Sequence, residues 1–231
     1  MSEIAILIPL LGRPGSAQRV LASIRRASSA EHRVLFLCSP HDRRKFRECS
    51  ALDAETLIVD WDAGPGDFAR KMNYGFRCTD EPFIFAGADD LTFESGWDEH
   101  VLTVAEKSGA GVVGTWDGAN PLVMRGRHAT HPLVRRSYAE SPTCTFDQSG
   151  PIYHEGYDHQ FCDNELVQAA RDRGEWAFAK HSRVLHRHPI FDRTVRMDGT
   201  YRKGLARGRE DADLFRERLR EWRRTKSLAP A

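Results

Sequence analysis

Eight consecutive apolar residues near the start of the chain, Ile4 to Leu11, constrain the fold more than any other feature of the sequence. A strand with one face in water alternates apolar and polar residues, whereas an unbroken apolar run is typical of a strand buried on both faces of a parallel sheet. Gly12 interrupts the run, and apolar residues then recur at helical spacing from Ala17 to Ala27. A buried strand followed by an amphipathic helix predicts an α/β protein.

The alternation of strand and helix continues along the chain. Short apolar runs predict further buried strands at 33–38, 56–60, 82–86, 111–115 and 176–185. Helical spacing recurs at 67–76, 95–107, 161–173 and, as a charged amphipathic helix, at 209–224. Parallel strands need crossover connections, which are usually helices. We therefore expect one domain with a mostly parallel, Rossmann-like central sheet flanked by helices and a C-terminal helical tail.

Length and composition limit the class of protein. The chain has 231 residues, which fits one α/β domain, and its 34 basic and 33 acidic residues leave a net charge of +1. No overall field therefore draws it to nucleic acid, although basic residues crowd 193–224. The start lacks the pattern of a signal peptide, and no apolar run approaches the ~20 residues of a membrane span. The five cysteines form no CxxC pair and should be reduced, so we expect a cytoplasmic protein.

Two adjacent carboxylates, Asp89 and Asp90, follow the predicted strand at 82–86 after Gly87 and Ala88. In open parallel sheets, ligands bind at the carboxyl ends of the strands. Paired carboxylates there suit a hard divalent cation that grips a diphosphate. Asp is also common where a strand meets a turn, because it hydrogen-bonds the backbone there. The pattern alone leaves both interpretations open.

His186 and His188 follow the last predicted strand, before Pro189. Imidazole is a good ligand for Mn²⁺ or Zn²⁺, and residues two apart on a strand point the same way. Solvated or packed histidines are an equally good interpretation. The further histidines at 128, 131, 154 and 159 have no recognised metal-ligand spacing.

Two acids open the predicted helix at 161–173. Asp163 falls inside the apolar arc of this helix, so it is either an N-cap or a base whose pKa burial adjusts. Glu165 falls outside the arc, and we expect it to be a solvated acid that complements the helix dipole.

A glycine-rich turn, Gly64 to Gly66, precedes the predicted helix at 67–76. Free backbone N–H groups there, together with Arg70 or Lys71, suit a phosphate. The turn also matches the G-x-G-x-x-A form of the dinucleotide fingerprint, but no acidic ribose ligand follows at the expected distance before Asp89. A Rossmann-type oxidoreductase is therefore a weaker alternative.

Several segments, in order along residues 4–190, resemble motifs of the GT-A glycosyltransferases, in particular the broad family-two group. The strand that ends at Pro9, together with Arg13-Pro14, looks like the first strand and donor-base loop of the family, and Gly64 to Gly75 is similar to its G-x-x-x-A-R-N-x-G helix, with the Asn shifted to Asn73. Phe85 to Asp90 falls at the D-x-D site of the family. Cys162 to Leu166 falls on its E-D-x-x-L helix, and Val184 to Pro189 falls on its terminal strand with the H-x-H-P ending.

The resemblance implies a GT-A fold and a metal-dependent hexosyl or pentosyl transferase. A sugar would move from a nucleotide-sugar donor, UDP-linked, to an acceptor hydroxyl with inversion. Asp163 would be the general base. Mn²⁺ or Mg²⁺ would be held by Asp89 and His186 with help from Asp90 or His188. The implied donor-binding residues are Pro9, Arg13, Arg70, Lys71, Asn73, Ala88, Asp89 and Asp90.

The sequence also departs from the family pattern. Gly87 stands where the family has its first metal-site Asp, so the metal duty passes to Asp89. Cys162 replaces the Glu of the E-D pair, which leaves Asp163 as the matching base. Cys38-Ser39-Pro40 replaces the paired Asp that usually follows the second strand.

A narrower resemblance is to small glycosyltransferases encoded by actinobacterial phages, carried by 88–91 with Gly96-Trp97, by 130–136 and by 154–157. It implies action in a host cytoplasm on a modified DNA base or a virion protein. A catalytically idle relative that binds glycan or nucleic acid is a further alternative, because Gly87 lacks the carboxylate of the family. We expect a transferase domain over 1–207, with 1–115 as the nucleotide-sugar half and 116–207 as the acceptor half, followed by the helix and tail over 208–231.

Overall fold

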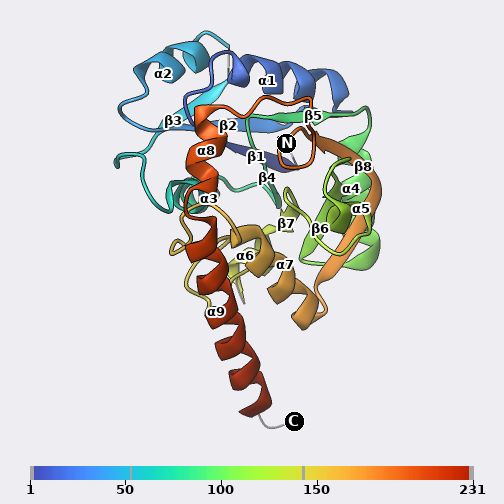
Figure 1. The fold of residues 1–231 in the computed structure, drawn as a ribbon. Coiled ribbons are helices and arrows are strands. Elements are labelled where there is room, and N and C mark those ends of the chain that lie inside the picture. The colour runs from blue at the N-terminus through green and yellow to red at the C-terminus, as the bar shows by residue number, and fades with distance from the viewer. Residues whose placement is uncertain (1–2, 53, 142–143, 229–231) are drawn as a thin grey trace.

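Strand β1 (Ile4–Pro9) is buried along its whole length between two parallel neighbours. The structure is a computed structural model that describes residues 3–52, 54–141 and 144–228 (Figure 1). β1 pairs with β2 (Arg33–Cys38) on one side and with β4 (Phe83–Ala86) on the other. Because both faces of β1 are covered, its apolar run has no polar alternation, as the sequence predicts.

The sheet has eight strands in the order β3-β2-β1-β4-β7-β6-β8-β5. Strands β3 (Glu55–Ile58), β6 (Val112–Trp116) and β8 (Trp176–His186) run in the same direction as β1. Two short strands run the other way: β7 (Leu133–Arg135), between β4 and β6, and β5 (Leu91–Phe93), beside β8. The mostly parallel sheet is confirmed. The antiparallel strands were not predicted, because three residues are too few to show a period.

Two helical layers cover the sheet (Figure 1). Ile4, Ile6 and Ile8 pack with α1 (Ser16–Ala27) and α4 (Trp97–Ser108), whereas Ala5 and Leu7 pack with α3 (Asp67–Arg77) and α7 (Cys162–Arg173). Successive strand residues point to opposite faces, so one apolar run serves both cores. The helices that the sequence did not predict are α2 (Arg43–Ser50), α5 (Pro121–Met124), α6 (Arg136–Glu140) and α8 (Gly199–Leu205).

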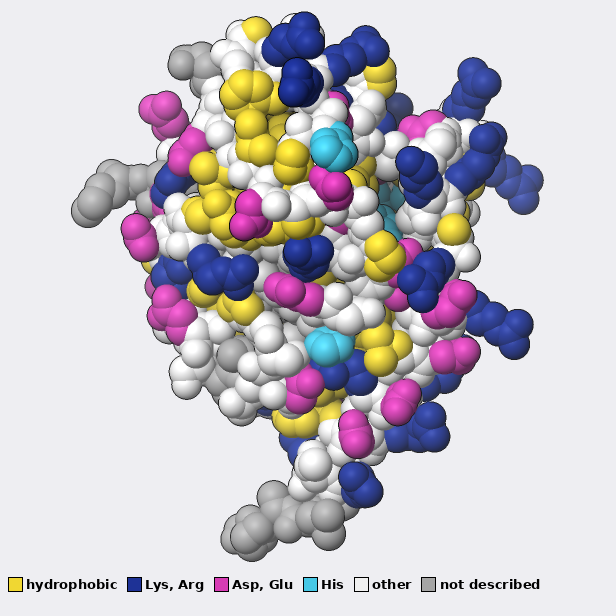
Figure 2. Space-filling view, turned by 90° about the vertical axis from the view of Figure 1, so that its left-hand side faces the viewer, with side chains coloured by type: hydrophobic (Ala, Val, Ile, Leu, Met, Phe, Trp, Pro, Cys, Tyr) yellow, Lys and Arg dark blue, Asp and Glu magenta, His cyan; other side chains and the backbone are white. Residues whose placement is uncertain are grey.

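The C-terminal helix α9 (Gly208–Leu228) runs away from the sheet and packs along α7, from Arg218 beside Glu165 to Trp222 beside Asp172 (Figure 1). Acidic and basic side chains are interspersed over the face shown in Figure 2, in keeping with the net charge of +1. Among residues 3–52, 54–141 and 144–228, no helix is both long and apolar enough to cross a bilayer.

The expectation of a solvated Glu165 is wrong, because α9 covers it. Glu165 is 1% exposed and accepts hydrogen bonds from Arg218 at 2.7 and 2.8 Å. The Tyr157 hydroxyl donates to it at 2.7 Å and the Phe146 N–H at 2.9 Å. A buried carboxylate is tolerated only when it is paired and hydrogen-bonded. The contact comes from a helix 53 residues further along the chain, which the periodicity of α7 does not reveal.

Replacing Arg218 by Ala should therefore lower the free energy of unfolding by about 3–5 kcal/mol, because it leaves the Glu165 carboxylate buried without a cation. Urea denaturation measures the loss. Arg216→Ala is the matched control: Arg216 lies on the same helix with an exposed partner, Asp213, and its loss should cost less than about 1 kcal/mol. Equal losses for the two variants would contradict the buried ion pair.

Candidate active site

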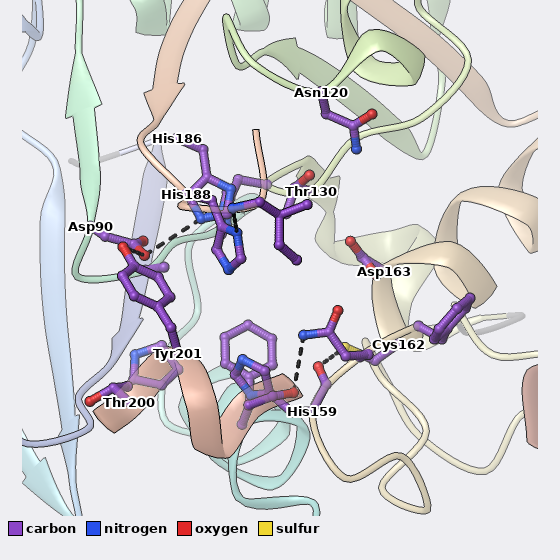
Figure 3. Close-up of a pocket in the computed structure, with 18 of the residues that line it drawn as sticks. Asp90, Asn120, Thr130, His159, Cys162, Asp163, His186, His188, Thr200 and Tyr201 are labelled. Carbon is purple, nitrogen blue, oxygen red and sulfur yellow. Dashed lines mark hydrogen bonds and ion pairs between the residues drawn. The ribbon is translucent and has the colours of Figure 1, made fainter. Parts of the chain in front are cut away.

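The polar side chains that follow β1, β4 and β8 meet at one edge of the sheet, because these parallel strands all end there. They border a cavity of about 320 Å³ (Figure 3). The antiparallel strands β5 and β7 begin at the same edge, and residues before them also reach the cavity. Its lining includes Pro9, Leu11, Arg13, Phe68, Ala88, Asp89, Asp90, Asn120, Leu122, His128, Thr130, His131, His159, Phe161, Asp163, His186, His188, Ile190, Phe191, Thr200 and Tyr201.

The guanidinium of Arg13 lies between the two predicted carboxylates. One of its nitrogens is 2.8 Å from Asp89 and 3.0 Å from Asp90, and another is 3.1 Å from Asp198. The flat face of the guanidinium lies 3.9 Å from the ring centre of Tyr201. Arg13 thus joins the chain after β1, the chain after β4 and helix α8 through one cation.

Helix α2 holds the loop that carries Arg13 in place through hydrogen bonds from Lys45. The buried Lys45 ammonium donates to the Arg13 carbonyl, to the Ser16 hydroxyl at 3.0 Å and to Glu48 at 3.0 Å. Gly12 has a φ of 75°, a left-handed conformation that glycine adopts without steric cost. Helix α2 was not predicted from the sequence, and neither was this support of the Arg13 loop.

Asp90 and His186 form a buried pair at 3.5 Å (Figure 3). Burial alone would raise the pKa of Asp90, but the hydrogen bond to His186 and the nearby cations hold it well below its ordinary value. Burial lowers the pKa of His186, but Asp90 outweighs burial and raises that pKa above its ordinary value. The Tyr201 hydroxyl, 3.1 Å from Asp90 and 3.0 Å from the Arg187 carbonyl, completes the cluster.

Two more imidazoles surround His186. The His131 ring meets it edge-on with 4.8 Å between centres, and the His188 ring lies 5.3 Å away. Burial and the charge of His186 lower the pKa of each to about 4, so both are neutral at pH 7. The Nδ1–H of His131 donates to the Ala86 carbonyl at 2.8 Å, and its buried Nε2 has no partner among the described residues. Only the pairing of β7 with β4 brings His131 here.

Asp163 lies on α7, across the cavity from Asp90 and His186 (Figure 3). Asp163 is not the N-cap of α7. The N-cap residue is Phe161, whose left-handed φ of 68° is uncommon for a residue other than glycine. Asp163 Oδ2 lies 3.2 Å from His128 Nε2. Burial raises the pKa of Asp163, but the charge and hydrogen bond of His128 outweigh it and lower the pKa below its ordinary value. The contact with His128 was not predicted from the sequence.

Three predicted donor-binding residues do not line this cavity. Arg70 stacks its guanidinium 4.4 Å from the ring centre of Trp61. Lys71 is fully buried, where it pairs with Asp67 at 2.8 Å and donates to the Leu10 carbonyl and to Ser39. Asn73 exchanges hydrogen bonds with the backbone of Ile152 and Tyr153. These contacts hold α3 in place.

The glycine-rich turn is also covered. The N–H of Gly66 donates to the Asp158 carbonyl at 3.1 Å, and a Cβ at Gly66 would lie 2.6 Å from the Glu155 carbonyl. The dinucleotide fingerprint requires this backbone to approach a pyrophosphate closely. The loop that covers Gly66 leaves no such approach.

The donor types at the edge of the sheet fit a divalent cation. Asp89 Oδ2 and Asp90 Oδ1 are buried without a hydrogen-bond partner among the described residues, and carboxylate oxygens with imidazole are ligands that Mn²⁺ accepts. In the described part of the chain, however, no three His, Cys, Asp or Glu side chains already form a metal-ligand group. Arg13 supplies the positive charge between the carboxylates instead.

Gly87 cannot carry the carboxylate that the family resemblance places there. Its N–H donates to the Leu7 carbonyl at 2.9 Å, and an added Cβ would lie 2.9 Å from that oxygen and 3.3 Å from Ile8. The crowding atom is a backbone oxygen of the central strand, which has no room to move. The close pairing of β1 and β4 therefore explains why the chain has glycine at position 87, where the family has a carboxylate.

Gly87→Ala should lower the free energy of unfolding by about 1–3 kcal/mol, because the added methyl group overpacks the strand pair. Gly64→Ala is the matched control, since no atom lies within 4 Å of its built Cβ. Thermal denaturation compares the two variants. Equal melting temperatures would show that the strands separate without cost.

Neither a protein-family model nor a curated protein matches the sequence. Solved structures do match. The S. aureus TarS 1-349 complex with UDP-GlcNAc has a TM-score of 0.62 at 9% identity over 89% of this chain and 64% of that one. The Pyrobaculum calidifontis mannosyltransferase PcManGT with GDP-Man and Mn²⁺ has a TM-score of 0.59 at 12% identity over 79% and 56%. Glucosyl-3-phosphoglycerate synthase from Mycobacterium tuberculosis with Mn²⁺, UDP and phosphoglyceric acid has a TM-score of 0.57 at 14% identity over 81% and 71%.

These likenesses show the fold, which is that of the GT-A glycosyltransferases: one α/β domain with a curled mixed sheet between helices. The fold predicted from the sequence is confirmed. The chain spans about six tenths of the length of the TarS and PcManGT chains that it matches.

Proposed function

We propose that this protein is a glycosyltransferase that moves a sugar from a nucleotide-sugar donor, UDP-linked, to an acceptor hydroxyl with inversion. One observation carries the proposal: the acidic and imidazole cluster of Asp90 and His186 and the lone carboxylate Asp163 line opposite sides of one cavity in a GT-A fold. Similar structures hold UDP-GlcNAc, GDP-Man or UDP, two of them with Mn²⁺. A glycosyl transfer needs two such groups on either side of the anomeric carbon, one for the leaving diphosphate and one for the attacking hydroxyl.

The cluster at the carboxyl ends of β4 and β8 would hold the donor. Asp90 and His186, with Asp89, would hold Mn²⁺ or Mg²⁺, which offsets charge on a departing diphosphate. Arg13 is a permanent cation in the same place, and its fork of donors suits phosphate oxygens as well as carboxylates. Pro9 and Ala88 lie beside it on the cavity wall.

Asp163 would accept the proton of the acceptor hydroxyl. As the hydroxyl oxygen bonds to the anomeric carbon, the bond from that carbon to the diphosphate oxygen breaks, and the nucleoside diphosphate leaves with the electron pair. His128 orients the carboxylate through its 3.2 Å contact with Oδ2. The other carboxylate oxygen, Oδ1, accepts a hydrogen bond from the Asn164 N–H. Because its pKa is below the ordinary value, Asp163 is ionised and ready to act as a base at neutral pH.

Two alternatives are separated by a donor screen. An oxidoreductase would be stabilised by NAD(P)H in a thermal-shift assay rather than by UDP-sugars, and the covered Gly66 turn argues against it. A catalytically idle relative would release no nucleotide from any donor. We expect slow release of UDP from a UDP-sugar, and we expect EDTA to abolish it. No release from any nucleotide-sugar, with or without added Mn²⁺, would contradict the proposal.

Asp163→Asn should reduce sugar transfer by about 10²–10⁴-fold, because the amide accepts no proton, while UDP binding stays unchanged. Nucleotide release measures the rate, and calorimetry with UDP measures binding. Asp213→Asn removes an exposed carboxylate from α9 and serves as the control. A normal rate in the Asp163 variant would remove this residue from the mechanism.

Asp90→Asn should abolish the dependence of UDP affinity on Mn²⁺, because the amide is a weak ligand and loses its charge partnership with His186. Calorimetry of UDP with and without Mn²⁺ tests the effect. Asp198→Asn, which changes the third carboxylate beside Arg13, should retain the Mn²⁺ dependence. An unchanged response in the Asp90 variant would place the cation elsewhere.

A further inference from the structure

The chain between β8 and α9 carries a local excess of positive charge. Residues 187–209, the basic segment, contain seven Arg and Lys and two Asp, a net charge of +5. The rest of the chain, with 27 basic and 31 acidic residues, is net −4. The near-neutral total therefore hides one cationic region on an otherwise acidic protein.

The seven basic side chains are all exposed: Arg187, Arg193, Arg196, Arg202, Lys203, Arg207 and Arg209. Both acids of the segment have hydrogen-bond or ion-pair partners. Asp198 binds Arg13, and Asp192 accepts hydrogen bonds from the N–H and hydroxyl of Thr194. The positive charge consequently faces solvent, where it attracts a polyanion.

The basic segment also forms one wall of the cavity. His188, Thr200 and Tyr201 line the interior (Figure 3), and Ile190 and Phe191 lie at its border with 53% and 46% of their surface exposed. Leu122 of α5, 48% exposed, lines the same cavity. We name Leu122, Ile190 and Phe191 the apolar lip. They are three of the six exposed large hydrophobic residues of the described chain.

We propose that the basic segment and the apolar lip bind a single-stranded stretch of nucleic acid, with one nucleotide entering the cavity to present a hydroxyl group, of its ribose or of a hydroxylated base, as the acceptor. The inference rests on the proposed glycosyl transfer for the role of that nucleotide. Arginine suits phosphate oxygens because its planar fork donates two hydrogen bonds at once, and six of the seven cations are arginines. Aromatic and apolar side chains beside a cationic track are how proteins hold unpaired bases by stacking.

The cavity behind the lip favours a nucleotide over a lipid. Asn120, Thr130 and Asp163 lie inside it, so an inserted acyl chain would meet amide, hydroxyl and carboxylate groups. A base presents an apolar face to the lip and polar edges to those groups. Enzymes that act on one nucleotide extrude it into such a pocket while the backbone stays outside. The segment is also a loop with one 7-residue helix, too short for an amphipathic membrane helix.

Fluorescence anisotropy with a labelled oligothymidylate of about 16 nucleotides tests the surface between about 50 and 200 mM salt. The double variant Arg193→Gln/Arg196→Gln should weaken binding about tenfold. It should also make the slope of log affinity against log salt concentration about 1.4 less negative, because each lost phosphate contact to a single strand removes about 0.7 from the slope. Arg26→Gln/Arg77→Gln is the matched control. These exposed residues end α1 and α3 at the opposite edge of the sheet, so their loss should change neither quantity.

Phe191→Ala separates stacking from charge. It should weaken the oligothymidylate about tenfold but leave binding of heparin, a polyanion without bases, unchanged. Equal weakening by the control pair, an unaffected affinity in Phe191→Ala, or binding to phosphatidylserine vesicles with none to the oligonucleotide would each overturn the inference.

The two proposals fail separately. Arg193 and Arg196 lie outside the cavity lining, so their variant should release UDP from a UDP-sugar at the wild-type rate. UDP release without oligonucleotide binding would remove only the nucleic-acid surface. Oligonucleotide binding by a protein that releases no nucleotide from any donor would remove the transferase, and with it the acceptor role of the bound nucleotide, but not the nucleic-acid surface.

Discussion

The pairing of Arg13 with Asp89 and Asp90 is the interaction on which the rest of the site depends. The side chains of the two carboxylates are 7% and 14% exposed, and a buried charge without a partner costs several kcal/mol. Arg13 supplies that partner and extends the same guanidinium to Asp198 and to the ring of Tyr201. The strand edge and helix α8 are therefore joined electrostatically at the cavity.

The same pairing shapes the proposed chemistry. A divalent cation and Arg13 compete for one pair of carboxylates, yet each carboxylate keeps one buried oxygen without a partner among the described residues. In the proposed function, those oxygens would bind the cation and the Arg13 guanidinium would bind the diphosphate. The neighbouring imidazoles His131 and His188 are neutral at pH 7, whereas the contact with Asp90 raises the pKa of His186 above its ordinary value. The cluster thus sets one permanent cation, Arg13, among three carboxylates, Asp89, Asp90 and Asp198.

The opposite side of the cavity has a different character. Asp163 faces it from α7 with His128 as its partner, and the apolar lip lies at the border. Asp90, on one side of the cavity, and Asp163, on the other, are more than 70 positions apart in the sequence. This division matches a reaction in which a charged donor and an acceptor approach one carbon from opposite faces. In the proposed reaction, the basic segment would extend the acceptor side beyond the cavity and would bind a long polyanionic acceptor there.

The sequence by itself determined the parallel strands of the sheet and their carboxyl edge, because buried strands and amphipathic helices carry a periodicity that survives without partners. It therefore placed Asp89, Asp90, His186 and His188 at the ends of the right strands. Tertiary structure alone decided what those residues meet. Arg13 and Tyr201 reach Asp90 across 77 and 111 residues, and His131 lies two residues before β7, a strand too short to have a period. It also took Lys71 and Glu165 into buried ion pairs, because which face of a helix is covered by a later segment is a property of packing and not of local pattern.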